Sequence, residues 1–266
     1  METRKTWPGA TSAYLRHLKA AGRSPGTIRI HRYYMGLLAG IAPCPAHVTT
    51  ERLEVWLSEH DWQPETRRSA QGVASTFFKY LVREEIVKKD PTLGLAPVHV
   101  PDGVPRPAPE AAVRHALANA PDRTALMVRF AAFCGLRACE IAKLRGSDWD
   151  GELLRVKGKG GRVRIIPVQD RTLIYHLEQC PGWLFPGRID GHLSAQYTAK
   201  LLGEYLPAGV TGHALRHRFG TVAYRATHDL LAVGAVMGHA KTDTTKRYIQ
   251  LDLDPLMRAV AAAQCA

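Results

Sequence analysis

The chain has 266 residues, 45% of them hydrophobic, and 36 basic against 24 acidic side chains give it a formal net charge of +12 at pH 7. This length has room for two domains that each bury a core, and the composition excludes an extended low-complexity protein. No run of 18 apolar residues occurs, and the first residues lack the apolar core of a signal peptide. We therefore expect neither membrane insertion nor secretion.

The basic excess favours a polyanionic partner, and nucleic acid is the commonest one. The alternative is a basic surface that serves only solubility. Residues 1–97 carry 14 basic and 9 acidic side chains, and residues 98–266 carry 22 and 15. Both parts of the chain can therefore face the same polyanion, as the two halves of a clamp would.

The cysteines are odd in number and form no Cys-x-x-Cys pair. They are Cys44, Cys134, Cys139, Cys180 and Cys265. This pattern predicts reduced thiols in a cytoplasmic protein, without a disulfide framework or a zinc site.

The first part of the chain reads as a compact four-helix unit. Apolar periodicity and capping residues predict helices over 11–21, from Ser24-Pro25 to Gly40, from Thr49 or Thr50 onward, and over 65–83. Lys89-Asp90-Pro91 breaks the pattern. Basic side chains of this unit are either a solvated face or contacts to backbone phosphates, and they include Arg29, Arg32, Arg67, Arg68 and Lys79.

Five prolines and one glycine lie within residues 96–109, which excludes a helix or a central strand there. This segment predicts a stiff linker. The expected organisation is a helical domain over 1–97, a linker over 98–108, and a second domain over 109–266.

The second part combines helices with one hairpin. Helices are expected from Pro109-Glu110, over 123–134, from Leu136 to Gly146, and over 170–180 and 194–206. Residues 152–157 and 162–168 are rich in β-branched side chains and flank a glycine-rich turn that carries Lys159. The segment Trp-Leu-Phe-Pro at 183–186 reads as ordinary core. The predicted fold class is mainly α with a small β-hairpin or sheet.

Residues 211–250 hold the densest set of chemically active side chains. His213 and Arg216 lie three apart, so they share one face of a helix. An imidazole beside a guanidinium suits an anionic group, such as a phosphate, that also needs a proton moved. Taken singly, His213 and His239 can be core histidines, and Tyr248 can be a packing aromatic.

Cleavage of a DNA phosphodiester without a metal needs fixed cations at the phosphate, a nucleophile and an acid for the leaving oxygen. The chain offers Arg137, Lys159 and Tyr248 for these tasks. Taken singly, Arg137 with Glu140 is a plain ion pair, and Lys159 is a solvated turn residue. No Walker glycine loop and no grouped set of catalytic carboxylates stand out, so we expect no metal and no cofactor.

The order of these groups resembles the tyrosine recombinase (phage integrase) family, in a minimal form without an arm-binding domain. Five motifs carry the resemblance: Gly135-Leu136-Arg137 with Glu140, Gly158-Lys159-Gly160 leading to Ile166-Pro167, His213-Ala-Leu-Arg216-His217, Met237-Gly238-His239, and Thr244-Thr245-Lys-Arg-Tyr248. It covers residues 109–250, while residues 1–97 resemble the family's helical core-binding domain.

The resemblance implies a role for each matching residue. Tyr248 attacks the scissile phosphate and forms a 3′-phosphotyrosine, and Lys159 protonates the 5′ leaving oxygen. The phosphate is held by Arg137 and Arg216, with a further hydrogen bond from His239. His213 moves the proton of Tyr248, and Glu140 braces the site. Arg162, on the hairpin, joins the expected DNA contacts.

The function so implied is site-specific DNA recombination, in phage or mobile-element integration and excision. The alternatives are a Xer-like chromosome or plasmid dimer resolvase, a type IB topoisomerase, and an inactive DNA-binding accessory protein. The implied partners are double-stranded DNA core sites, a homo-tetramer in the synaptic complex and an accessory directionality factor. The tail over 251–266 either docks into a neighbouring protomer or packs on its own domain. The implied location is the bacterial cytoplasm or nucleoid, or the host cytoplasm for a phage-encoded protein.

Overall fold

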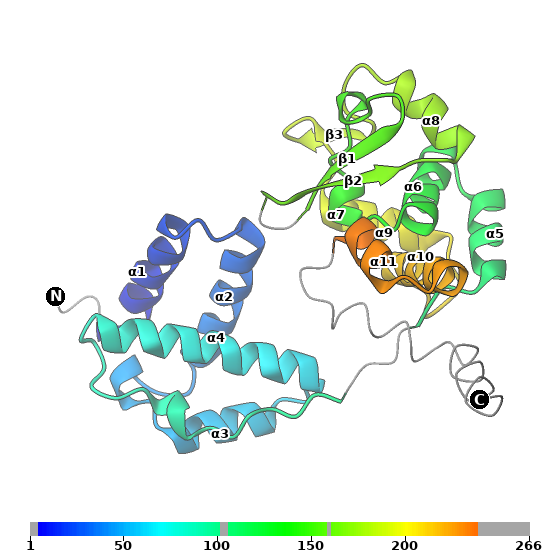
Figure 1. Ribbon diagram of the computed structural model, residues 1–266. Helices are drawn as coiled ribbons and strands as arrows, with labels where there is room; N and C mark the ends of the chain where they lie inside the picture. The colour runs from blue at the N-terminus through cyan, green and yellow to red at the C-terminus, as the bar shows by residue number, and fades with distance from the viewer. Residues whose placement is uncertain (1–4, 102–105, 159–160, 239–266) are drawn as a thin grey trace, which may run out of the picture. The chain divides into compact units, whose positions relative to one another are not determined.

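A computed structural model describes residues 5–101, 106–158 and 161–238 of the chain (Figure 1). The chain divides into two compact units, Met1–Asp102 and Gly103–Ala266. Each unit has a hydrophobic core of its own. Within the described residues, no helix is both long and apolar enough to span a membrane.

The first unit is helical, as the sequence predicts. Its α-helices are α1 (Trp7–Ala20), α2 (Pro25–Leu38), α3 (Thr50–Glu59) and α4 (Pro64–Arg83), with the short 3-10 helices η2 (Pro45–His47) and η3 (Pro91–Gly94). Helix α4 contacts each of the other three α-helices, so it forms the centre of the unit (Figure 1). The hydroxyls of Ser24 and Thr49 cap α2 and α3, which confirms these two helix starts.

The prediction for the first helix was wrong at its start, since α1 begins at Trp7 rather than at residue 11. The Thr6 hydroxyl accepts a hydrogen bond from the Gly9 amide and caps the helix. Pro8 lies in the first turn, where its missing amide hydrogen costs nothing. A proline that reads as a helix breaker is here part of a helix start.

The core of the first unit is aromatic. Phe77 and Phe78 of α4 are fully buried, and the ring of Tyr14 meets Phe77 edge-on at a centroid distance of 5.2 Å. The Tyr14 hydroxyl donates to Thr76 Oγ1 at 3.0 Å and lies 2.9 Å from His31 Nδ1. A small network of neutral groups therefore satisfies the buried hydroxyl.

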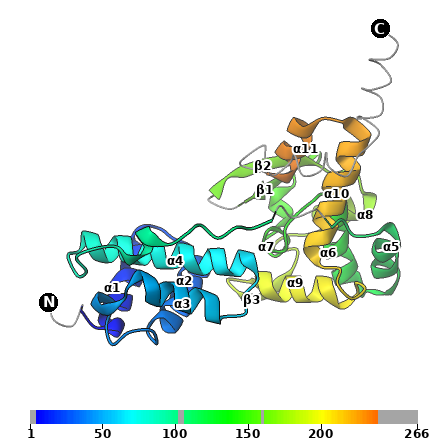
Figure 2. The same cartoon turned by 90° about the horizontal axis from the view of Figure 1, so that it is seen from below.

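The second unit surrounds a central helix. Its α-helices are α5 (Glu110–Asn119), α6 (Asp122–Phe133), α7 (Ala138–Ile141), α8 (Arg171–Glu178), α9 (Ala195–Glu204), α10 (Gly212–Thr227) and α11 (Leu230–Met237), with the 3-10 helix η4 (Gly146–Asp148). Its strands are β1 (Leu153–Lys157), β2 (Val163–Pro167) and β3 (Pro186–Ile189). Helix α6 contacts α5, α7, α8, α9 and α10, and Figure 2 shows α10 running beside it.

Strands β1 and β2 form the predicted antiparallel hairpin, with Leu153 opposite Pro167 and Lys157 opposite Val163. Side chains alternate between faces along β2, so Arg164 and Ile166 share the inward face. Helix α11 packs against β2. The inward face of β2 therefore packs toward the core of the unit, and the strand also contacts α11.

Two local predictions in this unit were wrong. The helix expected up to Gly146 ends at Ile141, because the Gly146 amide bonds Gly182 O and a Cβ at Gly146 would lie 1.8 Å from Cys180 O. The chain must leave the helix to make that approach. Strand β3 was not predicted, although Asp190-Gly191 is a turn signal; its bridges to His192 close around these two residues, which both have positive φ. Phe185, just before β3, is buried in the core as expected.

Candidate active site

The centre of the site is the buried carboxylate of Glu140, whose side chain is 2% exposed. Its Oε2 accepts from the Arg137 backbone amide at 2.9 Å, so Glu140 caps the start of α7. Its Oε1 accepts from Arg137 Nη1 at 2.9 Å. The sequence predicted this i,i+3 pair, and the structure confirms that the two side chains meet.

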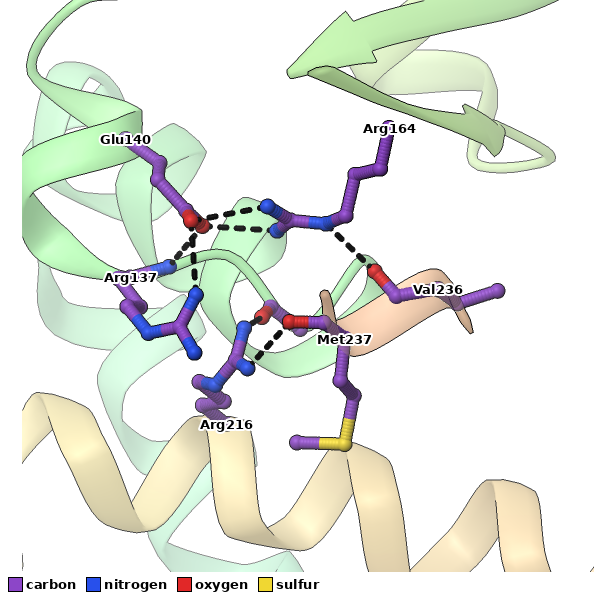
Figure 3. Close-up of polar contacts among 7 residues, drawn as sticks. Arg137, Glu140, Arg164, Arg216, Val236 and Met237 are labelled. Atoms are coloured by element: carbon purple, nitrogen blue, oxygen red, sulfur yellow. Dashed lines mark hydrogen bonds and ion pairs between the residues drawn. The ribbon is translucent and has the colours of Figure 1, made fainter. Parts of the chain in front are cut away.

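A second arginine, which the sequence did not reveal, closes the other side of the carboxylate. Arg164 Nη1 and Nη2 donate to Glu140 Oε1 and Oε2 at 2.8 and 2.7 Å, a bidentate pair (Figure 3). Its Nε donates to Val236 O at 2.7 Å. The only local signal was the alternation of β2, which places a basic side chain beside Ile166 on the buried face.

These contacts determine the charge of Glu140. Burial acts to raise the pKa of its carboxyl group, but the hydrogen bonds from Arg164 and from the Arg137 amide, with the two positive charges, outweigh burial and lower the pKa. Glu140 is therefore an anion that holds two cations in place.

Arg216 of α10 is 2% exposed and lies on the same site. Its Nη1 donates to Gly135 O and its Nη2 to Met237 O (Figure 3). These two bonds orient the guanidinium between the loop before α7 and the end of α11. Arg137 and Arg216 therefore reach the site from different elements, each held by fixed acceptors.

Both loops that meet Arg216 contain a glycine with positive φ. Gly135 has φ +65°, and a Cβ there would lie 2.5 Å from Phe219 Cδ1. Gly238 has φ +64°, and a Cβ there would lie 2.9 Å from Arg164 Cδ. Only glycine fits both the backbone conformation and the space.

His213 lies one turn before Arg216 in α10, on the same face, as predicted. Partial desolvation, together with the charges of Arg216 and Arg137, lowers the pKa of its imidazole below the ordinary value of 6.5. The His217 ring meets the His213 ring at 4.4 Å, nearly perpendicular. His213, Arg216 and Arg137 are therefore close enough to act on one another, and His213 is neutral at neutral pH.

Three predicted site residues, Lys159, His239 and Tyr248, lie outside the described residues. The described residues lie on both sides of Lys159 in the sequence and end directly before His239. Gly158 and Gly161 enclose the hairpin turn, with the Gly158 amide bonded to Arg162 O at 2.7 Å. Gly238, at the end of α11, directly precedes His239 in the sequence.

The predicted DNA contacts of the first unit line different hollows of its surface. Arg32 lines a hollow between α1 and α2 with Arg16 and Lys19, whereas Arg29 lines another one beside Tyr33. Arg68 lines a third hollow, next to residues 92–100.

The remaining candidates also differ in their surroundings. Lys79 and Arg162 are exposed. Arg67 is half-buried, and its Nε finds no acceptor among the described residues.

A basic cleft next to Glu140 was not predicted from the sequence. It has a volume of about 700 Å³. Its lining includes the cationic side chains Lys143, Arg145, Arg155 and Lys157, together with Asp148 and Asp190. The Arg145 guanidinium lies 3.7 Å from the centroid of the Trp183 ring, which fixes this cation in a stacked position. Such a surface suits a phosphate backbone.

Residues 5–101, 106–158 and 161–238 contain no group of three or more His, Cys, Asp or Glu side chains that could hold a metal ion. The sequence does contain Asp-x-Asp pairs, at 148–150 and 252–254. Asp148 accepts from the Arg145 amide, and Asp150 accepts from the amides of Glu152 and Leu153. This first pair therefore serves as local caps.

The chain resembles known proteins over most of its length. Residues 110–254 match the model of the phage integrase family. Tyrosine recombinase XerC of Chromohalobacter salexigens is 30% identical over 217 residues, which cover 74% of this chain and 73% of that protein. XerC of Chromobacterium violaceum is 28% identical over 280 aligned residues, covering 96% of this chain and 94% of that one. The structure of a lambda integrase tetramer bound to a Holliday junction has a TM-score of 0.71, at 16% identity, over 89% of this chain and 78% of that one.

The family match and these relatives define the class of protein: DNA strand-cleaving and rejoining recombinases. The chain belongs to the phage integrase family of tyrosine recombinases. It is an enzyme of DNA recombination.

Proposed function

We propose that the chain cleaves DNA through Tyr248 and holds the scissile phosphate with Arg137 and Arg216. The observation that carries this proposal is the pair of arginines, each oriented by fixed acceptors and both acting on the charge of His213. Oriented cations stabilise the negative charge that a phosphate gains in the transition state. They do so without reorganising during the reaction.

The other groups complete the reaction. Tyr248 forms a bond to the phosphorus and the bond to the 5′ oxygen breaks, which leaves a 3′-phosphotyrosine. Lys159 gives a proton to the departing 5′ oxygen, and His213 takes the proton of the Tyr248 hydroxyl. The low pKa of His213 favours the neutral form that can accept this proton. His239 donates a further hydrogen bond to the phosphate.

The DNA partner follows from the charge and from the cleft. The net charge of +12 and the cations beside Glu140 support binding of a duplex, with Arg162, Arg29, Arg32, Arg68 and Lys79 as additional phosphate contacts. Phosphate contacts make affinity strongly salt-dependent but carry no sequence information. The tetramer on a Holliday junction, seen for lambda integrase, supports a homo-tetramer as the synaptic form.

The decisive experiment uses a pool of nicked suicide duplexes with a randomised core sequence. A recombinase is trapped on such DNA because the short 5′ product diffuses away. We expect a covalent 3′ adduct, in the presence of EDTA and without ATP, and its sequence identifies the site. Tyr248→Phe should give no adduct. Tyr197→Phe, which removes an exposed hydroxyl of the same unit, should behave as wild type.

The absence of an adduct with the wild-type protein would overturn the proposal, and so would an adduct that persists in Tyr248→Phe. The first outcome would leave the inactive accessory protein. The captured sequence then serves to separate the remaining readings. Strand exchange between two copies of the site supports a recombinase, whereas relaxation of any plasmid supports a topoisomerase.

The biological outcome has two candidates. Integration and excision of a mobile element is one, and it is the case that would need a directionality factor. The near full-length similarity to a protein named XerC favours dimer resolution as the other. Recombination of directly repeated captured sites on a plasmid, without any added protein, is expected for a resolvase. A requirement for two different sites is expected for an integrase.

A further inference from the structure

Arg164 has no assigned part in the reaction, yet it joins three segments of the site. Its side chain is 10% exposed. The guanidinium uses Nη1 and Nη2 on Glu140 and Nε on Val236 O, at 2.7–2.8 Å (Figure 3). The planar group is therefore held along two edges by two different elements, while its own backbone belongs to β2.

Through its contact with Glu140, Arg164 affects the orientation of Arg137. Each carboxylate oxygen of Glu140 accepts one hydrogen bond from the Arg164 guanidinium. Each also accepts one from Arg137: Oε2 from its backbone amide and Oε1 from its Nη1. Any rotation of the carboxylate would change both bonds of Arg137 together. Because Arg164 grips both oxygens, it sets the plane of the carboxylate and thereby the direction of the Arg137 guanidinium.

Through its contact with Val236, Arg164 acts on the same segment that Arg216 binds. Val236 and Met237 are consecutive residues at the end of α11, and their carbonyls are taken by Arg164 and Arg216 respectively. The stem of Arg164 also packs on Gly238, where a Cβ would lie 2.9 Å from Arg164 Cδ. Arg164 and Arg216 thus hold the segment that leads to His239 from two sides.

A purely structural role of Arg164 does not account well for its buried ion pair with Glu140. Enclosing charges in a protein interior is costly, and an apolar side chain of similar size often stabilises as much as a buried ion pair. The arrangement does explain how Arg137 is held at a defined angle. Arg155 differs from the buried Arg164: it lies on the paired strand β1, opposite Ile165, and its side chain is exposed.

We infer that Arg164 is a positioning residue of the cleavage reaction, which acts on the scissile phosphate through Glu140 and Arg137. This inference rests on the proposed function. It predicts that loss of Arg164 affects the stabilisation of phosphate charge, and that it does not affect protonation of the leaving oxygen.

The test uses the duplex captured by the wild-type protein, and a second duplex with a methylphosphonate at the cleaved position. The methyl group replaces a non-bridging oxygen, so less negative charge develops for the arginines to stabilise. Single-turnover cleavage is measured at saturating protein for wild type, Arg164→Met, Arg164→Lys, Arg137→Ala and the control Arg114→Met, at an exposed side chain of α5. Thermal unfolding of every variant is measured in parallel.

We expect Arg164→Met to cleave the phosphate duplex about 10- to 100-fold more slowly, below the loss of about 10²–10³ expected for Arg137→Ala. The loss of cleavage rate relative to wild type should be smaller on the methylphosphonate duplex for both Arg164→Met and Arg137→Ala. Arg164→Lys keeps the charge but loses the fork, so an intermediate rate is expected. Arg114→Met should cleave both duplexes like wild type.

A double variant shows whether Arg164 acts through Arg137. Arg137→Ala with Arg164→Met should cleave the phosphate duplex no more slowly than Arg137→Ala alone, because residues of one unit are not additive. Multiplied deficits in the double variant would overturn the inference.

Equal deficits of Arg164→Met on the two duplexes would also overturn it, as would a normal rate. If Arg164→Met fails to fold, Arg164→Lys decides by the same comparison of duplexes. A wild-type protein that forms no adduct would instead overturn the proposed function, so the two failures are distinguishable.

Discussion

In the first unit, the buried Tyr14 hydroxyl is satisfied by Thr76 and His31 inside an aromatic core. In the second unit, the buried Glu140 carboxylate is satisfied by Arg137 and Arg164, and Arg216 is buried nearby. The first network contains neutral groups, which can be removed at small cost. The second contains charges, which remain buried only while every partner is present.

This difference separates a core that only has to be stable from one that also has to bind an anion. A site that holds a phosphate needs cations at fixed positions, and an apolar core cannot supply them. The second unit therefore keeps one carboxylate to orient two guanidinium groups.

Glu140→Ala should have the largest effect, because it leaves the charges of Arg137 and Arg164 without their anion. Removing one partner of a buried pair destabilises by about 3–5 kcal/mol. The free energy of unfolding in urea measures this, and the suicide duplex should give little adduct. Glu152→Ala, at an exposed carboxylate, is the control. A loss below about 1 kcal/mol would show that the charged network is not what holds this region.

Gly135→Ala should destabilise by about 1–3 kcal/mol from backbone strain, with a further loss from the clash with Phe219. Gly22→Ala in the first unit is a matched control, since its φ is +68° but nothing lies within 4 Å of the added Cβ. The difference in unfolding free energy between the two variants isolates the effect of close packing. Equal losses would mean that Phe219 moves aside freely.

Tyr14→Phe should destabilise the protein by only about 0.5–1.5 kcal/mol, because it removes neutral hydrogen bonds. It should leave the rate of adduct formation unchanged. Tyr33→Phe, at a side chain that is 59% exposed, is the control for loss of a hydroxyl. A marked fall in adduct formation by Tyr14→Phe would contradict the separation of the two networks.

The smallest expected effects are those of pH. Burial, with the charge of Arg23, lowers the pKa of His31 in the first unit, and partial desolvation, with the charges of Arg216 and Arg137, lowers that of His213 in the second. The unfolded chain therefore takes up these protons first, and stability falls as the pH drops below about 6.5. Glu140 also has a lowered pKa, so its contribution is present above 4.5 and is lost further into acid.

Urea unfolding between pH 7 and pH 4 measures these steps. His213→Gln should weaken the dependence below pH 6.5, where the contribution of His31 remains, and leave the loss below pH 4.5. In the wild-type protein, cleavage should persist to a lower pH than an ordinary histidine would allow. A rate that falls with a midpoint above 6.5 would contradict the lowered pKa of His213.

Much of the local structure could be predicted from the sequence. Helix starts at Ser24 and Thr49 depend on a side chain and an amide three residues apart, and the Arg137–Glu140 pair spans the same distance. The hairpin follows from β-branched strands around glycines. The early end of α7 was missed because the distant approach of Gly146 to Cys180 decides it. Strand β3 was missed although its turn at Asp190-Gly191 is a local signal.

By itself, the sequence determined the element types, the order of the site motifs and the family that this order indicates. These features depend on neighbouring residues or on residue identity. Only the tertiary structure decided which groups support the arginines. Arg164 meets Glu140 across 24 positions and Val236 across 72, and Arg216 meets Gly135 across 81. Such contacts have no periodicity or spacing in the sequence, because they exist only after distant segments have packed together.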